Sequence, residues 1–321
     1  MSLLTFNHLK PSDLKESEEA SDSAIDEEAI LCNIPRELYK PPALVAKICE
    51  EKALLKDWHK QVVAAPASFD DFLMNPTLNR FPNVLCLDRT RVRLSEEYGK
   101  GDYYHASYVD SYERQRGYIL SQAPYSSTTE ELFWRMVIDV KPTFIVVLGS
   151  LQGGSGPAIK RFWPETEKTY PNSVTIIQAC VEGQCSDIVG IQICARKKEI
   201  LRLPIVIYKE WKDDLVVPNL IEFRESVQAM EKLLPRKDGP ILLVCASGVT
   251  RCGTYAALDI ILTRIAKEKK VGIQQTTEIV LAQRYGCFQF MEHYKAIYDL
   301  AKRTLLAASY NFWGDGSNRA C

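Results

Sequence analysis

The segment that most constrains the fold lies between residues 240 and 269. Residues 240–244 are an apolar run with the composition of a buried strand, and residues 254–269 carry apolar side chains at helical spacing. The connection between them is short and contains Gly248 and Gly253. A loop that leads from a strand into the amino terminus of a helix points several backbone amides at one spot, and the helix dipole adds to their field. The sequence therefore predicts an anion-binding loop at this junction.

The chemistry of that loop comes from Cys245 and Arg251, which stand six positions apart. The field that attracts an anion also favours a thiolate, so we expect Cys245 to have a lowered pKa and to be a nucleophile. Arg251 offers a planar fork that can bind two phosphoryl oxygens. The backbone between them is expected to bind phosphate through Ala246, Ser247, Gly248, Val249 and Thr250.

The Cys-x5-Arg pattern also has a purely structural interpretation. Cys245 would then be a buried thiol at the end of a strand, and Arg251 a surface residue. The position of the pattern after a strand and before a helix favours the anion site.

The rest of the chain indicates an α/β protein with a twisted, mixed sheet. Runs of β-branched and apolar residues predict strands at 144–148, 174–179, 188–195 and 199–208. Helical periodicity predicts helices at 219–234 and 291–306, and an amphipathic helix at 44–63 followed by a short helix with Ser68 as its N-cap. We expect an acidic, disordered tail at 1–38, one domain at 39–308 and a flexible tail at 309–321.

Composition excludes several classes of function. The 40 basic and 41 acidic residues nearly cancel, so nothing global indicates a nucleic acid or an anionic membrane as partner. No apolar run reaches the roughly 20 residues that span a bilayer, and we expect a soluble, cytoplasmic protein. The ten cysteines are scattered and should be reduced thiols, while four histidines argue against a histidine metal site. We expect no metal and no cofactor; the oligomeric state is not encoded in any pattern.

Nearly the whole stretch from 44 to 306 resembles the tyrosine-specific protein phosphatase domain of the cysteine-dependent family, non-receptor type. The motifs follow the family's order: LNRF at 78–81 is similar to the phosphotyrosine-recognition loop, and DYYHASY at 102–108, SQAP at 121–124 and FWRM at 133–136 come next. WKD at 211–213 falls at the mobile acid loop and QRYGCFQ at 283–289 at the water-positioning glutamines. The resemblance implies a highly twisted mixed β-sheet flanked by helices on both sides.

The resemblance also implies roles. Cys245 attacks phosphorus to give a phosphocysteine, and Asp213 acts as general acid, with the neighbouring Asp214 as the alternative. Gln289 orients the hydrolytic water, with Gln283 secondary. Two residues contact the substrate: Phe81, which would stack on its ring but could equally be a core aromatic, and Asn83, which stands where the family has an aspartate that holds the peptide backbone.

Several positions depart from the family, and they leave the function open. Cys252 replaces a serine or threonine, so we expect a higher pKa for Cys245 and slower breakdown of the intermediate. The other departures are Val244 for histidine, Thr250 for glycine, Lys212 for proline, Gly153 for glutamate and Phe290 for threonine.

These departures permit two functions. The chain is either a slow protein tyrosine phosphatase or a pseudophosphatase that binds phosphotyrosine without releasing phosphate. The surviving Cys245, Asp213, Arg251 and Gln289 favour the enzyme, acting on a phosphotyrosine-containing protein or peptide. A dual-specificity or phosphoinositide phosphatase is disfavoured, because those sites are wider and lack the loop around Phe81.

Overall fold

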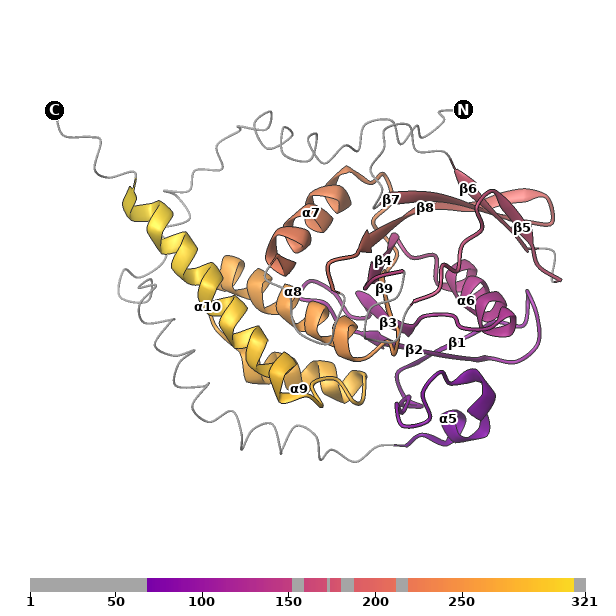
Figure 1. Ribbon diagram of the computed structural model, residues 1–321, viewed down its shortest axis with the longest axis horizontal. Helices are drawn as coiled ribbons and strands as arrows, with labels where there is room; N and C mark the ends of the chain where they lie inside the picture. Colours follow the sequence, from indigo (N-terminus) through magenta and orange to yellow (C-terminus); the bar gives the residue numbers. More distant parts are fainter. Residues whose placement is uncertain (1–67, 152–158, 172–173, 180–187, 212–218, 315–321) are drawn as a thin grey trace.

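The chain folds around one nine-stranded mixed sheet (Figure 1). The computed structural model describes residues 68–151, 159–171, 174–179, 188–211 and 219–314. Four strands at the centre of the sheet run parallel, in the order β3 (Tyr118–Gln122), β9 (Ile241–Cys245), β4 (Phe144–Leu148) and β8 (Lys198–Tyr208). Antiparallel strands extend both edges: β2 (Tyr103–Val109) and β1 (Arg91–Arg93) beside β3, and β7 (Ile188–Ala195), β6 (Val174–Ala179) and β5 (Glu167–Thr169) beside β8.

Helices cover both faces of the sheet. Alternate residues of the central strands enter two separate cores, because successive side chains of a strand point to opposite faces. In β4, Val146 packs into the core shared with α8 (Thr250–Glu268), whereas Ile145 packs against α6 (Ser127–Val140) on the other face. The first core also includes α7 (Leu220–Leu233), α9 (Ile273–Gln283) and α10 (Met291–Gly314). The predicted mixed sheet flanked by helices on both sides is confirmed.

Helix α8 begins at Thr250, four residues before the predicted start. Its first turn is closed by the amide of Gly253, which donates to the carbonyl of Val249 at 2.7 Å. Arg251 and Cys252 are therefore helical, so their side chains are held by a rigid element beside the loop. The predicted strands at 144–148, 174–179 and 188–195 match the observed bounds, and the strand predicted at 199–208 starts one residue earlier.

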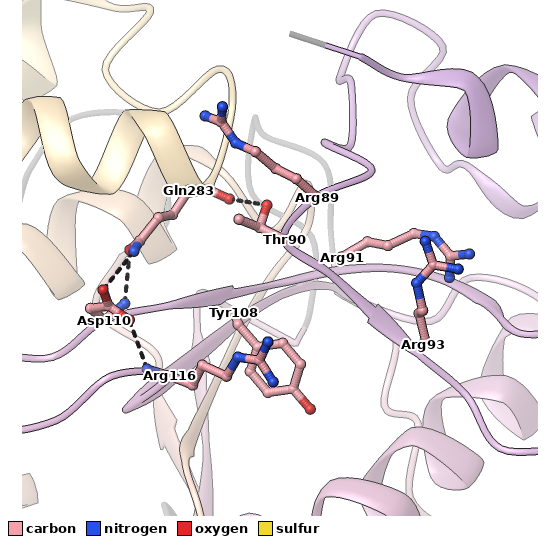
Figure 2. Close-up of a pocket in the computed structure, with 8 residues that line it drawn as sticks. All are labelled: Arg89, Thr90, Arg91, Arg93, Tyr108, Asp110, Arg116 and Gln283. Atoms are coloured by element: carbon pink, nitrogen blue, oxygen red, sulfur yellow. Dashed lines mark hydrogen bonds between the residues drawn. The ribbon is translucent and has the colours of Figure 1, made fainter.

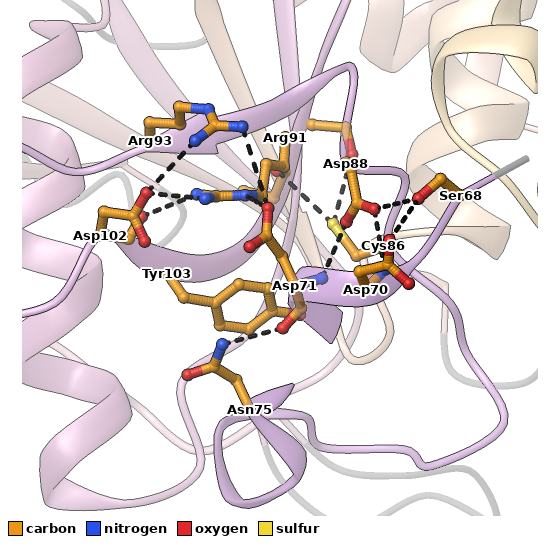
Figure 3. Close-up of polar contacts among 12 residues, drawn as sticks. Ser68, Asp70, Asp71, Asn75, Cys86, Asp88, Arg91, Arg93, Asp102 and Tyr103 are labelled. Carbon is orange, nitrogen blue, oxygen red and sulfur yellow. Dashed lines mark hydrogen bonds and ion pairs between the residues drawn. The ribbon is translucent and has the colours of Figure 1, made fainter. Parts of the chain in front are cut away.

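The prediction that Ser68 caps the short helix α5 (Asp70–Met74) is wrong. The N-cap is Phe69, which has no capping side chain, and the carboxylate of Asp88 accepts the amides of Asp70 and Asp71 at 2.8 and 3.1 Å. Ser68 Oγ instead donates to Asp88 at 2.5 Å (Figure 3). A carboxylate 18 residues along the chain can replace a local cap, which no local pattern reveals. The 3₁₀ turn η1 (Pro76–Leu78) follows.

The last helix reaches Gly314, so residues 309–314, which the sequence predicts to be flexible, are helical. Ala307 and Ala308 favour continuation of the helix, and no proline or glycine interrupts the chain before Gly314. The proposed tail at 1–38 and the helix at 44–63 lie outside the described residues, and those boundaries stay predictions. Among the helices of the described part, none combines the length and apolar character that crossing a membrane requires.

Candidate active site

Cys245 ends β9, one of the four parallel strands at the centre of the sheet. Strand β9 lies between β3 and β4, and Cys245 is in register with Gln122 of β3. The Cys245 carbonyl accepts the amide of Ala123 at 2.8 Å, which fixes the point where the backbone leaves the sheet. Sites in α/β proteins form outside the carboxyl ends of parallel strands, and Cys245 lies at this edge.

A pocket of about 150 Å³ opens above Cys245. It is lined by residues from the recognition loop, the phosphate loop and the start of α10: Phe81, Asn83, Val84, Cys245, Ala246, Ser247, Thr250, Arg251 and Phe290. A cavity of this volume holds a benzene ring, so one aromatic side chain fits. The structure thus brings together most of the predicted substrate-binding residues.

The loop after Cys245 curls back onto the sulfur. The amide of Gly248 donates to Cys245 Sγ at 3.2 Å, and Ser247 Oγ lies 3.9 Å from the same sulfur. Gly248 has φ +69°, and a Cβ there would lie 2.3 Å from the backbone nitrogen of Gln122. Only glycine permits this turn so close to β3.

The curl makes Cys245 a thiolate at neutral pH. Burial opposes ionisation, but hydrogen bonds from the thiol and amide of Cys252, the charge of Arg251 and the amide of Gly248 together lower the pKa of Cys245 to about 5. Burial raises the pKa of Cys252 well above its usual value, and its hydrogen bond to Cys245 raises it further. Cys252 therefore remains a protonated thiol that donates to the Cys245 thiolate. The predicted low pKa of Cys245 agrees with this geometry, despite the loss of the family's hydroxyl.

Arg251 is held almost out of solvent, with 5% of its surface exposed. Its Nη1 lies 3.4 Å from the carbonyl of Leu148 at the end of β4. The next residue, Gly149, has φ +141°, and a Cβ there would lie 2.2 Å from Arg251 Nη1. Gly149 therefore leaves room for the guanidinium. Gly153, where the family's bracing glutamate is missing, lies outside the described residues.

Gln122 fixes the recognition loop over the pocket. Its Oε1 accepts the amide of Arg80 at 3.0 Å, and its Nε2 donates to the carbonyl of Leu78 at 2.8 Å. The Arg80 guanidinium lies over the ring of Phe81, 5.5 Å from the centroid. Phe81 is partly buried: it packs against the core and also lines the pocket. Its stacking on a substrate ring stays a prediction.

Arg284 is a residue of the site that the sequence did not single out. It is fully buried and holds the phosphate loop in place through hydrogen bonds. Its Nε donates to the carbonyl of Gly248 at 2.9 Å, its Nη1 to Ser107 Oγ at 3.0 Å, and its Nη2 to His105 Nδ1 at 2.9 Å. The signal that could have found it is its place in the motif at 283–289.

His105 connects Arg284 to the recognition loop. Burial and the charge of Arg284 lower its pKa to about 3, so the imidazole is neutral. Because a guanidinium can only donate, Nδ1 is the acceptor, and Nε2 donates to the carbonyl of Val84 at 2.9 Å. One chain of hydrogen bonds thus joins the recognition loop, His105, Arg284 and the phosphate loop.

The two predicted water-positioning glutamines differ in place. Gln283 is not at the pocket: it ends α9 and faces the end of β2, where its Nε2 donates to Asp110 Oδ2 at 2.7 Å and its Oε1 accepts the Asp110 amide at 2.8 Å (Figure 2). Gln289 is exposed, with its amide against Gly286 and next to Val249, beside the pocket rather than among its lining residues.

The predicted acid cannot be placed. Asp213, Asp214 and Lys212 lie outside the described residues, and the buried Trp211 is the last described residue before them.

Comparison with known proteins agrees with this geometry. The family model for the protein-tyrosine phosphatase domain matches residues 75–303. The Lar-like tyrosine-protein phosphatase of Caenorhabditis elegans is 30% identical over 236 residues, covering 70% of this chain and 10% of the relative. The Lar phosphatase of Drosophila melanogaster is 29% identical (70% of this chain, 11% of the relative), as is human receptor-type tyrosine-protein phosphatase C (75% and 18%).

The chain spans about a tenth to a fifth of the length of these relatives. They are a Lar-type and a receptor-type phosphatase, so the expected non-receptor subtype stays a prediction. The matched region contains the phosphate loop, the recognition loop and the buried arginine described above. The chain belongs to the protein-tyrosine phosphatase family.

Proposed function

We propose that this chain hydrolyses phosphotyrosine in proteins through a phosphocysteine intermediate. The observation that carries the proposal is the Cys245 thiol, with a pKa of about 5, at the floor of a pocket that holds one aromatic ring and contains Arg251. A nucleophile that is ionised at neutral pH, beside a guanidinium that can bind two phosphoryl oxygens, suits phosphoryl transfer.

In the first step, Cys245 Sγ forms a bond to phosphorus while the bond from phosphorus to the tyrosine oxygen breaks. Arg251 and the amides of residues 246–250 bind the phosphoryl oxygens, where charge accumulates. The leaving phenolate takes a proton from Asp213, or from Asp214 if the additional residue in the loop rearranges it.

In the second step, water attacks phosphorus, its proton passes to the carboxylate of Asp213, or of Asp214 if that residue is the acid, and the bond between phosphorus and Cys245 Sγ breaks. The sulfur leaves as a thiolate, and the hydrogen bond from the Cys252 thiol stabilises it. Gln289 would orient this water after its amide turns from Gly286 toward the pocket. We do not assign this role to Gln283, because the oxygen and the nitrogen of its side-chain amide both bind Asp110.

The pocket also accounts for selectivity. Phe81 and Asn83 line its mouth, and its volume of about 150 Å³ matches one ring. Phe81 would stack on the phosphotyrosine ring, while a phosphoserine lacks the length to bring its phosphate from the rim to Cys245. An inositol phosphate carries several charged substituents on its ring, which this narrow pocket does not fit. The partner we propose is a phosphotyrosine-containing protein or peptide.

The second candidate is a phosphotyrosine-binding module without turnover. Thr250 and Phe290, which stand where the family has glycine and threonine, both line the pocket and narrow it. A pocket narrowed in this way would bind the substrate while slowing the approach of water.

Phosphate release from a phosphotyrosine peptide, measured for wild type and for Cys245→Ser, separates the two. If the chain is an enzyme, phosphate release should collapse in Cys245→Ser. Peptide binding, measured by calorimetry, should persist. Equal background rates with retained binding would make the chain a binding module.

Asp213→Ala and Asp214→Ala identify the acid, since only the true donor should lower the rate steeply without weakening binding. A substrate with a better leaving group, such as 4-nitrophenyl phosphate, should be affected less by the same variant, because its leaving oxygen needs a proton less.

We also propose a cytoplasmic location and the non-receptor subtype. The five cysteines of the described residues are all free thiols, and a catalytic thiolate needs a reducing compartment. Fractionation of cells that express the chain tests the location.

A further inference from the structure

A second hollow, of about 340 Å³, lies at the β1 edge of the sheet (Figure 2). Eight residues line it, and four of them are arginines. The lining consists of Arg89, Thr90, Arg91, Arg93, Tyr108, Asp110, Arg116 and Gln283. We call it the arginine hollow. It shares no lining residue with the pocket above Cys245, so the phosphatase mechanism does not use it.

Two of the four arginines are already neutralised. Arg91 is buried and pairs with Asp71 and Asp102, both at 2.6 Å. Arg93 approaches the same two carboxylates only at 3.9 and 3.6 Å, and 64% of its side chain is exposed (Figure 3). Two positive and two negative charges balance here, so Arg91 and Arg93 line the hollow without adding net positive charge that would attract a ligand.

Arg89 and Arg116 differ, because within the described residues neither makes an ion pair. Arg89 donates one hydrogen bond to the carbonyl of Ala282, and the guanidinium of Arg116 lies over the Tyr108 ring, 5.0 Å from its centroid. Asp110, the only carboxylate of the lining, accepts from the Arg116 amide at 2.8 Å and from Gln283 at 2.7 Å. Both guanidinium groups therefore keep donors for an external anion.

The arrangement of the two arginines selects an extended ligand. Figure 2 shows Arg89 and Arg116 apart, with Thr90 between them and the Tyr108 ring beside Arg116. A single phosphate binds where several donors converge, as at the loop above Cys245. Guanidinium groups that stand apart instead suit a peptide with several carboxylates, each of which can be bound by one arginine.

The chain itself contains such a peptide. Residues 16–28, ESEEASDSAIDEE, carry seven acidic side chains and no basic one: Glu16, Glu18, Glu19, Asp22, Asp26, Glu27 and Glu28. The described domain begins at Ser68, which donates to Asp88, and the Asp88 amide donates back to the Ser68 carbonyl at 3.1 Å (Figure 3). Arg89 is the next residue, so the chain joins the domain beside the hollow.

The tether permits this contact. Residues 29–67 separate the acidic segment from Ser68. If residues 44–63 form the predicted helix, they add only about 1.5 Å per residue, but the 15 residues from 29 to 43 still span up to about 50 Å when extended, at about 3.3 Å per residue. A covalent tether of this kind gives the segment an effective concentration on the order of 1 mM, so even a weak site is occupied.

We propose that the acidic segment, residues 16–28, binds in the arginine hollow with carboxylates on Arg89 and Arg116. The contact is electrostatic, and it weakens as salt is added because both arginines are exposed. This inference is independent of phosphatase activity.

The test uses the full chain and a fluorescent peptide of sequence 16–28. Fluorescence anisotropy is compared between wild type and a tail-neutral variant, in which the seven acidic residues become Gln or Asn. If the site binds with a Kd of about 100 µM, the tethered segment should weaken peptide binding to wild type by about tenfold relative to the tail-neutral variant. Adding Arg89→Gln and Arg116→Gln to the tail-neutral variant should reduce peptide binding by at least about tenfold.

The matched control removes two positive charges elsewhere: Arg196→Gln with Lys197→Gln, at an exposed turn between β7 and β8. This pair should leave peptide binding unchanged. Three results would overturn the proposal: no peptide binding to the tail-neutral variant at low salt, equal binding to wild type and the tail-neutral variant, or equal losses from the control pair and the Arg89/Arg116 pair. The second would mean that the chain's own acidic segment does not occupy the hollow.

Discussion

The pocket above Cys245 and the arginine hollow differ in how their arginine charge is held. Above Cys245, Arg251 is 5% exposed, and backbone amides converge on the same point. In the arginine hollow, the guanidinium groups of Arg89 and Arg116 stand apart on exposed side chains. Charges shielded from water interact strongly over short distances, whereas exposed charges are screened by salt within about 10 Å. The first arrangement suits chemistry on one dianion, and the second suits weak binding of an extended acidic chain.

We expect the largest loss of activity from Arg251→Lys, at the buried guanidinium. A lysine keeps the charge but loses the planar fork, so we expect phosphotyrosine hydrolysis to fall about 10²–10³-fold. Steady-state kinetics with a phosphotyrosine peptide measure the effect. A rate within twofold of wild type would show that the buried guanidinium does not bind the transferring phosphoryl group.

Arg284→Met tests whether the phosphate loop depends on its buried brace. The variant leaves the Gly248 carbonyl and His105 without their partner, so we expect the free energy of unfolding to fall by about 2–4 kcal/mol and activity by about 10–10²-fold. Denaturant unfolding and kinetics on the folded fraction measure the two effects.

Arg135→Met is the matched control for that variant. Arg135 is also buried, and it donates to the carbonyls of Lys100, Ser95, Gly99 and Gly101, away from the pocket. It should destabilise the fold to a similar degree and leave kcat/KM unchanged. Equal losses of activity in both variants would make Arg284 a structural residue only.

Cys252→Ala tests how much the Cys252 thiol lowers the pKa of Cys245. With a pKa of about 5, Cys245 is almost fully ionised at pH 7 and only about one-tenth ionised at pH 4, so its alkylation by iodoacetamide should slow about tenfold between these pH values. Removing the Cys252 donor should move the midpoint of this profile upward, whereas Cys252→Ser, which restores a donor, should keep it low. An unchanged profile in Cys252→Ala would exclude the thiol as a donor.

The smallest effect is expected for Arg89→Gln. Arg89 is exposed and outside the pocket above Cys245, so kcat/KM for a short phosphotyrosine peptide should change less than about twofold and stability by less than about 0.5 kcal/mol. A loss comparable to that of Arg284→Met would mean that the two hollows are not independent.

The sequence predicts the core of the fold where one pattern dominates. β4 and β9 are continuous apolar runs buried on both faces, and the loop after β9 has its Cys and Arg at a fixed spacing, so both strands and the anion site follow directly. β2 could not be recognised in the same way, because its YYHASYV sequence is buried almost throughout yet includes polar residues. Both His105 and Ser107 find a buried partner in Arg284, far along the chain.

The same reason explains the errors at the site. Gln283 lies in a motif whose spacing suggests a role at the pocket, but its side chain is committed to Asp110, a partner 173 residues away. Ser68 has the right residue type for a cap, yet Asp88 supplies it. Contacts between distant residues decide both cases, and single-sequence patterns do not contain them.

Trapping the covalent intermediate shows whether the Cys245 thiolate takes the phosphoryl group from phosphotyrosine. Wild type is mixed with a phosphotyrosine peptide, quenched in acid within milliseconds, digested and analysed by mass spectrometry. We expect one phosphoryl group on the fragment that contains Cys245, and none in Cys245→Ser. Phosphate release with Cys245 unmodified at every quench time, or a phosphoryl group on another residue, would contradict it.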